Sequence, residues 1–137
     1  MLTHLLDTSA WLAHLLREPG SSQVTELFTD PDHCVGICSV SLVELHARLK
    51  ALGYESLFAQ ILERYRPLFE SIVSVDEEVA IQATKLRQNA QSRLPALDAM
   101  IAAAASSQGA TLVHRDVHFS GIDLEKLNQL VLPSNAT

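Results

Sequence analysis

The sequence predicts an α/β protein in which a parallel sheet carries helices on both faces. Short apolar segments typical of buried strands alternate with longer segments whose apolar residues recur at helical spacing. Strands that alternate with helices form parallel sheets, because each helix returns the chain to the edge where the next strand begins. With 137 residues the chain can build one self-sufficient core. We therefore expect a single domain over residues 1–137.

The expected elements follow one another without a linker or an internal repeat. Candidate strands are the apolar segments 1–6, 33–38, 71–75, 111–113 and 127–132. The first helix should begin at the capping hydroxyls of Thr8 or Ser9. Later helices are expected over 21–29, from Ser39 or Ser41 to a stop at Gly53, over 54–69, from 76 onward, and from about 96 to Gly109. Residues 133–137 are expected to form a frayed, flexible tail.

Composition and charge exclude several classes of protein. The formal net charge is −6, which argues against a simple basic nucleic-acid binder but not against an enzyme whose carboxylates bind divalent ions. No apolar run approaches the ~20 residues of a membrane span, and no basic segment precedes the first apolar run. Cys34 and Cys38 would lie roughly 13 Å apart on a strand, beyond disulfide reach. We expect a cytoplasmic protein with reduced thiols.

Four acidic residues stand where the fold brings distant parts of the chain together. Asp7 directly follows the first strand, and Asp116 follows the fourth. Glu44 and Asp98 lie near the starts of two helices, which in such folds point to the edge where the strands end. Ligand sites form at that edge of open parallel sheets. Asp7 could instead be only a helix cap, but three further acids in similar settings favour a shared site.

Clustered carboxylates need a counter-charge. Two carboxylates about 4 Å apart repel each other by roughly 4 kcal/mol at an effective dielectric constant of 20. Hard divalent ions such as Mg²⁺ or Mn²⁺ prefer oxygen ligands and relieve this repulsion. Such ions also lower the pKa of a bound water and stabilise charge on a phosphate, which is the chemistry of a metal-dependent nuclease.

Four sequence blocks resemble the PIN-domain ribonucleases, and closely the VapC toxins of toxin–antitoxin pairs: residues 5–9, 41–45, 94–103 and 111–119. The resemblance implies a three-layer α/β/α sandwich with a four- or five-stranded parallel sheet and Mg²⁺- or Mn²⁺-dependent endoribonuclease activity. It also implies a VapB-like antitoxin as partner, and we expect a homodimer. The implied catalytic and metal-binding residues are Asp7, Glu44, Asp98 and Asp116. Thr8 and Ser9 fall where the family places hydroxyls beside the metal.

The chain departs from the family pattern at two positions. His114 stands where the family commonly has Thr or Ser, and His118 stands where it often has a further acid. Both changes remove oxygen ligands, and either histidine could contact metal or substrate phosphate. Candidate contacts to RNA phosphates are Arg93, Arg115 and His114.

Two other interpretations remain open at this stage. An aspartyl-phosphate phosphotransferase or receiver domain also uses strand-end carboxylates with Mg²⁺, but the phosphatase type needs a second Asp where Ser9 stands. A non-catalytic PIN module that binds RNA or protein is the other alternative. The two histidine departures keep this alternative open, while the intact set of four acids argues against it.

Overall fold

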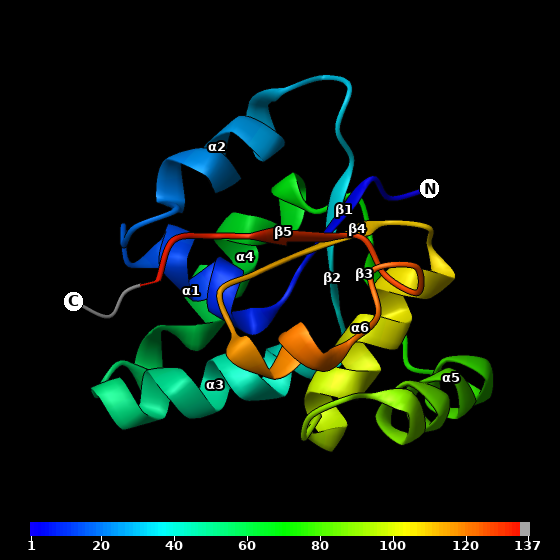
Figure 1. Cartoon of the computed structure of the whole chain (residues 1–137). Coiled ribbons are helices and arrows are strands. Elements are labelled where there is room, and N and C mark those ends of the chain that lie inside the picture. Colours follow the sequence, from blue (N-terminus) through cyan, green and yellow to red (C-terminus); the bar gives the residue numbers. More distant parts are fainter. Residues whose placement is uncertain (135–137) are drawn as a thin grey trace.

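A five-stranded parallel sheet lies between two layers of helices in the computed structural model, which describes residues 1–134 (Figure 1). The strands are arranged in the order β3-β2-β1-β4-β5, and every neighbouring pair is parallel. This confirms the predicted three-layer architecture. Residues 135–137, the end of the expected tail, lie outside the described residues.

The strands are shorter than the apolar segments that predict them, and the helices fill most of the chain between them. The strands are β1 His4–Leu6, β2 Val35–Cys38, β3 Ile72–Val73, β4 Thr111–His114 and β5 Gln129–Val131. The helices are α1 Thr8–Leu15, α2 Ser21–Thr29, α3 Val40–Leu52, α4 Phe58–Tyr65, α5 Glu77–Asn89 and α6 Ala96–Ser107. Short 3₁₀ turns are η1 Glu55–Leu57, η2 Arg66–Leu68 and η3 Val117–Gly121.

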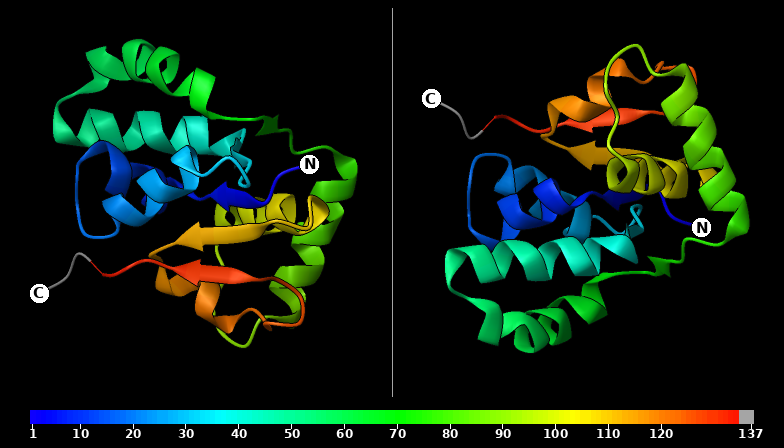
Figure 2. Two further views of the ribbon diagram at one scale, coloured as in Figure 1. Left: turned by 90° about the horizontal axis from the view of Figure 1, so that it is seen from above. Right: turned by 90° about the horizontal axis from the view of Figure 1, so that it is seen from below.

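Alternation of side chains along the strands divides the core into two halves. Leu5 and its neighbour Leu112 on β4 belong to the half packed against α5 and α6. Leu6 and its neighbour Val113 belong to the half packed against α1, α2, α3 and α4. Successive residues of a strand face opposite sides of the sheet, so β1, β2, β3 and β4 each supply both halves. Figure 2 shows α3 and α4 lying together and α5 and α6 lying together in another part of the molecule.

The alanines of α6 let this helix pack closely on the middle of the sheet. Ala99 and Ala102–Ala105 are completely buried, together with Ile101. Small side chains allow a helix backbone to approach its neighbours, and α6 is packed against α5, β2 and β4. This close packing fixes the N-terminal end of α6, which carries Asp98.

The helix expected over residues 54–69, with Pro67 expected to end or distort it, is divided into three parts. The segment forms η1, α4 and η2 in succession, and Pro67 lies in the last of these turns. Proline lacks the N–H that an α-helix interior requires, which explains why the α-helix ends at Tyr65.

Gly53 ends α3 with a φ of 85°, as its position predicts. Both cysteines are free thiols. Among residues 1–134, no helix is long and apolar enough to cross a membrane.

Candidate metal centre

All four predicted acids line one cavity of about 360 Å³ at the edge of the sheet where the strands end. Asp7 directly follows β1, and Asp116 lies two residues beyond β4. Glu44 projects from the second turn of α3, and Asp98 from the first turn of α6. The parallel order of β1 and β4 therefore brings together carboxylates that are more than one hundred residues apart in the sequence.

Asp7 is held in place by the start of α1. Its side chain, only 3% exposed, accepts hydrogen bonds through Oδ1 from the backbone N–H of Ala10 at 3.0 Å and from Ser9 Oγ at 2.5 Å. Asp7 is thus the N-cap of α1, and the prediction that Thr8 or Ser9 caps this helix is wrong. An Asp in extended conformation ahead of a helix is a preferred cap, because it satisfies an N–H that has no partner within the helix. The capping role does not exclude the metal role, since Asp7 also lines the cavity.

The two most buried acids of the cavity resist ionisation. Burial raises the pKa of Asp7 to about 7, partly offset by the hydrogen bonds from Ser9 and Ala10 and reinforced by the charges of Asp116 and Asp98. Burial, together with the charges of Asp116 and Glu44, raises the pKa of Asp98 to about 6. Carboxylates whose pKa values are raised by burial and by neighbouring carboxylates are typical of functional sites. A cation bound at the cavity would lower these pKa values and favour the ionised carboxylates.

Thr8 and Ser9 contact the acids of the cavity in two different ways. Thr8 Oγ1 donates a hydrogen bond to Glu44 Oε1 at 2.6 Å, which fixes a carboxylate of α3 against the start of α1. Ser9 Oγ donates to Asp7 and also accepts from the backbone N–H of Arg115 at 3.0 Å. Ser9 therefore ties the position of Asp7 to the loop that carries Asp116.

Asp98, Asp116 and His118 form the tightest group of metal-ligating atoms in the part of the chain that the structure describes. One ligand atom from each residue lies within 4.8 Å of the other two. Nδ1 of His118 is 3.1 Å from Asp98 Oδ2 and 3.0 Å from Asp116 Oδ1. Asp116 Oδ1 also accepts a hydrogen bond from the backbone N–H of His118 at 2.9 Å, so the η3 turn itself sets the distance between the two side chains.

His114 holds the loop that carries Asp116 in place through a hydrogen bond to its backbone. Its ring is 2% exposed, its Nε2 lies 2.7 Å from Gln129 Oε1, and its Nδ1 accepts a hydrogen bond from the backbone N–H of Asp116 at 3.1 Å. Burial lowers the pKa of His114, in agreement with a neutral ring that donates through Nε2 and accepts through Nδ1. His114 thus positions the loop that carries Asp116, and its contact with RNA phosphate stays a prediction.

The basic residues near the cavity differ in their access to it. Arg115 lines the cavity, pairs through Nη2 with Glu18, and keeps its buried Nη1 without a protein hydrogen bond. Arg93 is exposed and does not line the cavity. Arg48 lines it but is absent from the sequence prediction. Its position four residues after Glu44, on the same helix face, is the signal that could have found it.

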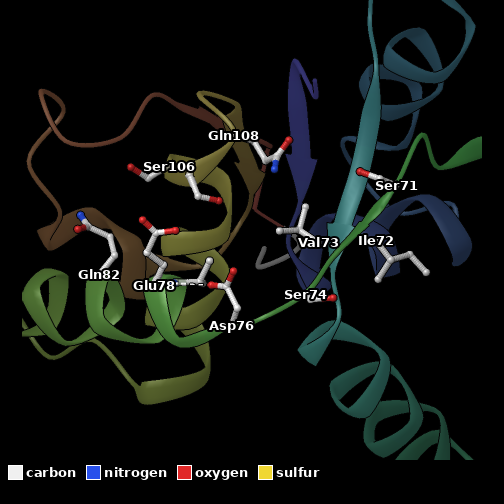
Figure 3. A pocket seen from close by; sticks show the side chains of 11 residues that line it. Ser71, Ile72, Val73, Ser74, Asp76, Glu78, Gln82, Ser106 and Gln108 are labelled. Carbon is white, nitrogen blue, oxygen red and sulfur yellow. Dashed lines mark hydrogen bonds between the residues drawn. The ribbon is translucent and has the colours of Figure 1, made fainter.

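A larger hollow of about 750 Å³ lies at the β3 edge of the sheet (Figure 3). It is lined by β3, the first turns of α5 and the C-terminal end of α6, whose opposite end carries Asp98. Of its two acids, Asp76 caps α5 through a hydrogen bond from the N–H of Val79 at 2.9 Å. The rest of its polar lining consists of serine and glutamine side chains. Size therefore does not identify the site; converging carboxylates do.

The residues at the smaller cavity fit a divalent ion. Asp7, Glu44, Asp98 and Asp116 supply hard oxygen donors, and two of them carry raised pKa values that a cation would relieve. Arg115 and Arg48 add positive charge at the cavity, where a phosphate would sit.

The comparison with protein families decides the classification. The sequence model of the PIN domain matches residues 4–124. The chain belongs to the PIN-domain family. No curated protein matched the chain in sequence. The match includes all four acids of the cavity, from Asp7 to Asp116.

Several solved structures share the fold of this PIN domain. VapBC2 from Rickettsia felis, bound to a DNA fragment from its promoter, matches with a TM-score of 0.78 and 18% identity, over 96% of this chain and 100% of that chain. FitAcB from Neisseria gonorrhoeae matches with a TM-score of 0.73 and 25% identity, over 93% of this chain and 96% of that one. VapBC-5 from Mycobacterium tuberculosis, a member of the VapBC family of toxin–antitoxin systems, matches with a TM-score of 0.68 and 22% identity over 96% and 99%.

Proposed function

We propose that this PIN domain is an endoribonuclease dependent on Mg²⁺ or Mn²⁺ and acts as the toxin of a VapBC-type pair. The observation that carries the proposal is the meeting of Asp7, Glu44, Asp98 and Asp116 around one cavity. Family membership supports a nuclease, and the shared fold with VapBC complexes supports the toxin role.

In this proposal each acid has a definite task. Asp7, Asp98 and Asp116 would hold the ion directly or through water, and Glu44 would either hold a second ion or orient the attacking water. A divalent ion bound here would lower the pKa of a coordinated water and stabilise the charge that develops on the phosphate. Thr8 and Ser9 keep Glu44 and Asp7 aimed at the cavity through the hydrogen bonds described above. Arg115, which lines the cavity, would attract the RNA phosphate through its positive charge.

The proposed partners follow from the same comparisons. A VapB-like antitoxin would inhibit the enzyme by placing a cationic or bulky segment at the acidic cavity, and RNA in the cytoplasm would be the substrate. We also propose a homodimer, which light scattering on the purified protein tests directly. Expression of the chain in growing cells tests the toxin role. We expect growth arrest, relief of the arrest by the protein encoded beside the chain, and no arrest with Asp98→Asn.

A cleavage assay tests the enzymatic proposal. Fluorescent single-stranded and hairpin RNAs are incubated with the protein in Mg²⁺, Mn²⁺ or EDTA. We expect cleavage with either metal, none in EDTA, and none with Asp7→Asn or Asp98→Asn. Asp123→Asn is the matched control, because Asp123 is exposed and lies outside the cavity. Cleavage that persists in EDTA or in the two site variants contradicts the proposal, and RNA binding without cleavage in either metal indicates a non-catalytic module.

A further inference from the structure

The environment of His118 Nδ1 is unusual for a histidine beside two carboxylates. The Nδ1 atom is buried, although 43% of the side chain is exposed. It lies close to Asp98 Oδ2 and Asp116 Oδ1, yet neither oxygen is placed to accept a well-aligned hydrogen bond from it. The buried nitrogen therefore lies against two carboxylates of the acidic cavity, although His118 itself does not line the cavity.

The distances around His118 Nδ1 are compatible with a shared ion as well as with hydrogen bonds. Neighbouring donor atoms around an octahedral ion with bonds of about 2.1 Å are about 3.0 Å apart. The separations of 3.1 Å and 3.0 Å from Nδ1 to the two carboxylate oxygens match this spacing. The three atoms come from two elements, α6 and η3, and the backbone N–H of His118 already fixes Asp116 against the ring.

We propose that His118 Nδ1 is a ligand of the divalent ion at this site, with Asp98 and Asp116, and that it makes the protein prefer Mn²⁺ to Mg²⁺. The proposal rests on the metal site of the proposed function and deepens it. Mg²⁺ is a hard ion that favours oxygen and water, whereas imidazole binds first-row transition ions more strongly. A nitrogen where the family pattern often has an acid would therefore shift the choice of metal.

A spectroscopic measurement tests the nitrogen ligand without relying on activity. Electron spin-echo envelope modulation on the Mn²⁺-loaded protein should show ¹⁴N coupling from a directly bound imidazole. The signal should change when the protein is labelled with ¹⁵N-histidine, which requires no mutation. It should disappear in His118→Asp, which offers an oxygen instead, and remain in the control His46→Gln, because His46 is exposed on α3 and outside the cavity.

Calorimetry tests the metal preference. We expect the ratio of Mn²⁺ to Mg²⁺ affinity to fall at least about tenfold in His118→Asp, the scale on which changes around a metal site alter affinity. Mn²⁺ that binds and supports cleavage without ¹⁴N coupling, or an unchanged affinity ratio, overturns the role of His118 and leaves the nuclease proposal standing. Absence of any Mn²⁺ binding that depends on Asp98 overturns both.

Discussion

Thr8 Oγ1 donates a 2.6 Å hydrogen bond to Glu44 Oε1, and this bond joins the first helix of the chain to the third. Thr8 is 6% exposed, and Glu44 is partly buried beside it. The bond holds the Glu44 carboxylate at the cavity. The other three carboxylates reach the same cavity from other elements. Without it, Glu44 would be free to turn toward solvent from its place on α3.

Thr8→Val should therefore lower the rate of RNA cleavage while leaving the fold intact. Valine keeps the shape of threonine but removes the hydroxyl, so Glu44 loses its partner. Groups that orient metal ligands typically contribute 10- to 100-fold, and we expect a loss of at least about tenfold in kcat. Thr8→Ser keeps the hydroxyl and should retain most of the activity. Equal rates for the valine and serine variants would show that the bond is not needed.

Asp7→Asn should make the metal-free protein less sensitive to pH. The pKa of Asp7 is raised by burial from 3.8 to about 7, so the folded state favours the protonated form. The stability that this preference contributes is complete below pH 4 and is lost as the pH rises toward 7 and beyond. A change of this size corresponds to about 4 kcal/mol as an upper estimate. Asparagine keeps the oxygen that caps α1 and has no charge to lose.

Urea unfolding in EDTA between pH 4 and pH 8 measures this effect. The free energy of unfolding of the unmodified protein should fall relative to that of Asp7→Asn as the pH rises. The difference between the two proteins isolates Asp7, because other titrating groups, including His114 with its lowered pKa, are common to both. Parallel curves for the two proteins would contradict the burial of an ionisable Asp7.

Divalent ions should stabilise the protein more at pH 8 than at pH 5. At pH 8 Asp7 and Asp98, with pKa values of about 7 and about 6, are ionised and bind the ion, whereas at pH 5 protons compete for them. An ion at 100 times its Kd adds about 2.7 kcal/mol, which raises the Tm of a domain of this size by roughly 8 °C. Thermal unfolding with and without Mn²⁺ at the two pH values gives the answer, and Asp98→Asn should abolish the shift.

Arg115→Gln should raise the KM for RNA about tenfold and change kcat less. One guanidinium nitrogen pairs with Glu18, and the side chain lines the cavity, where its positive charge would attract a phosphate. A charge-assisted hydrogen bond to a phosphate contributes about 1.5–3 kcal/mol. Steady-state kinetics on a short RNA, with Arg64→Gln as an exposed control of the same charge, separates this role from a general loss of positive charge. An unchanged KM would leave Arg115 only its ion pair with Glu18.

The sequence predicts the sheet and the acidic site because both depend on local patterns: alternating strand and helix segments, and acids placed at the ends of strands and the starts of helices. Asp7 and Asp116 could be placed at one edge because each directly follows a strand and parallel strands end together. The position of Glu44 and Asp98 near helix starts made their convergence expected as well. The resemblance to PIN domains then assigned these four residues their roles.

Details that depend on tertiary packing could not be predicted. The sequence offers three adjacent residues that could cap the first helix, Asp7, Thr8 and Ser9. In the structure Thr8 donates its hydrogen bond to Glu44 on α3, and Asp7 caps the helix. The pairing of His114 with Gln129 depends on β5 lying beside β4, which the sequence around His114 does not show. The contact of His118 with Asp98 joins residues on η3 and α6 whose proximity no local pattern reveals.

The metal site itself can be located by crystals grown with Mn²⁺ and measured at a wavelength where manganese scatters anomalously. We predict an anomalous peak in the cavity lined by Asp7, Glu44, Asp98 and Asp116, within bonding distance of the Asp98 and Asp116 carboxylates. A cavity without a peak, or a peak only at the hollow beside Asp76 and Glu78, would contradict the assignment of these four acids as the metal centre.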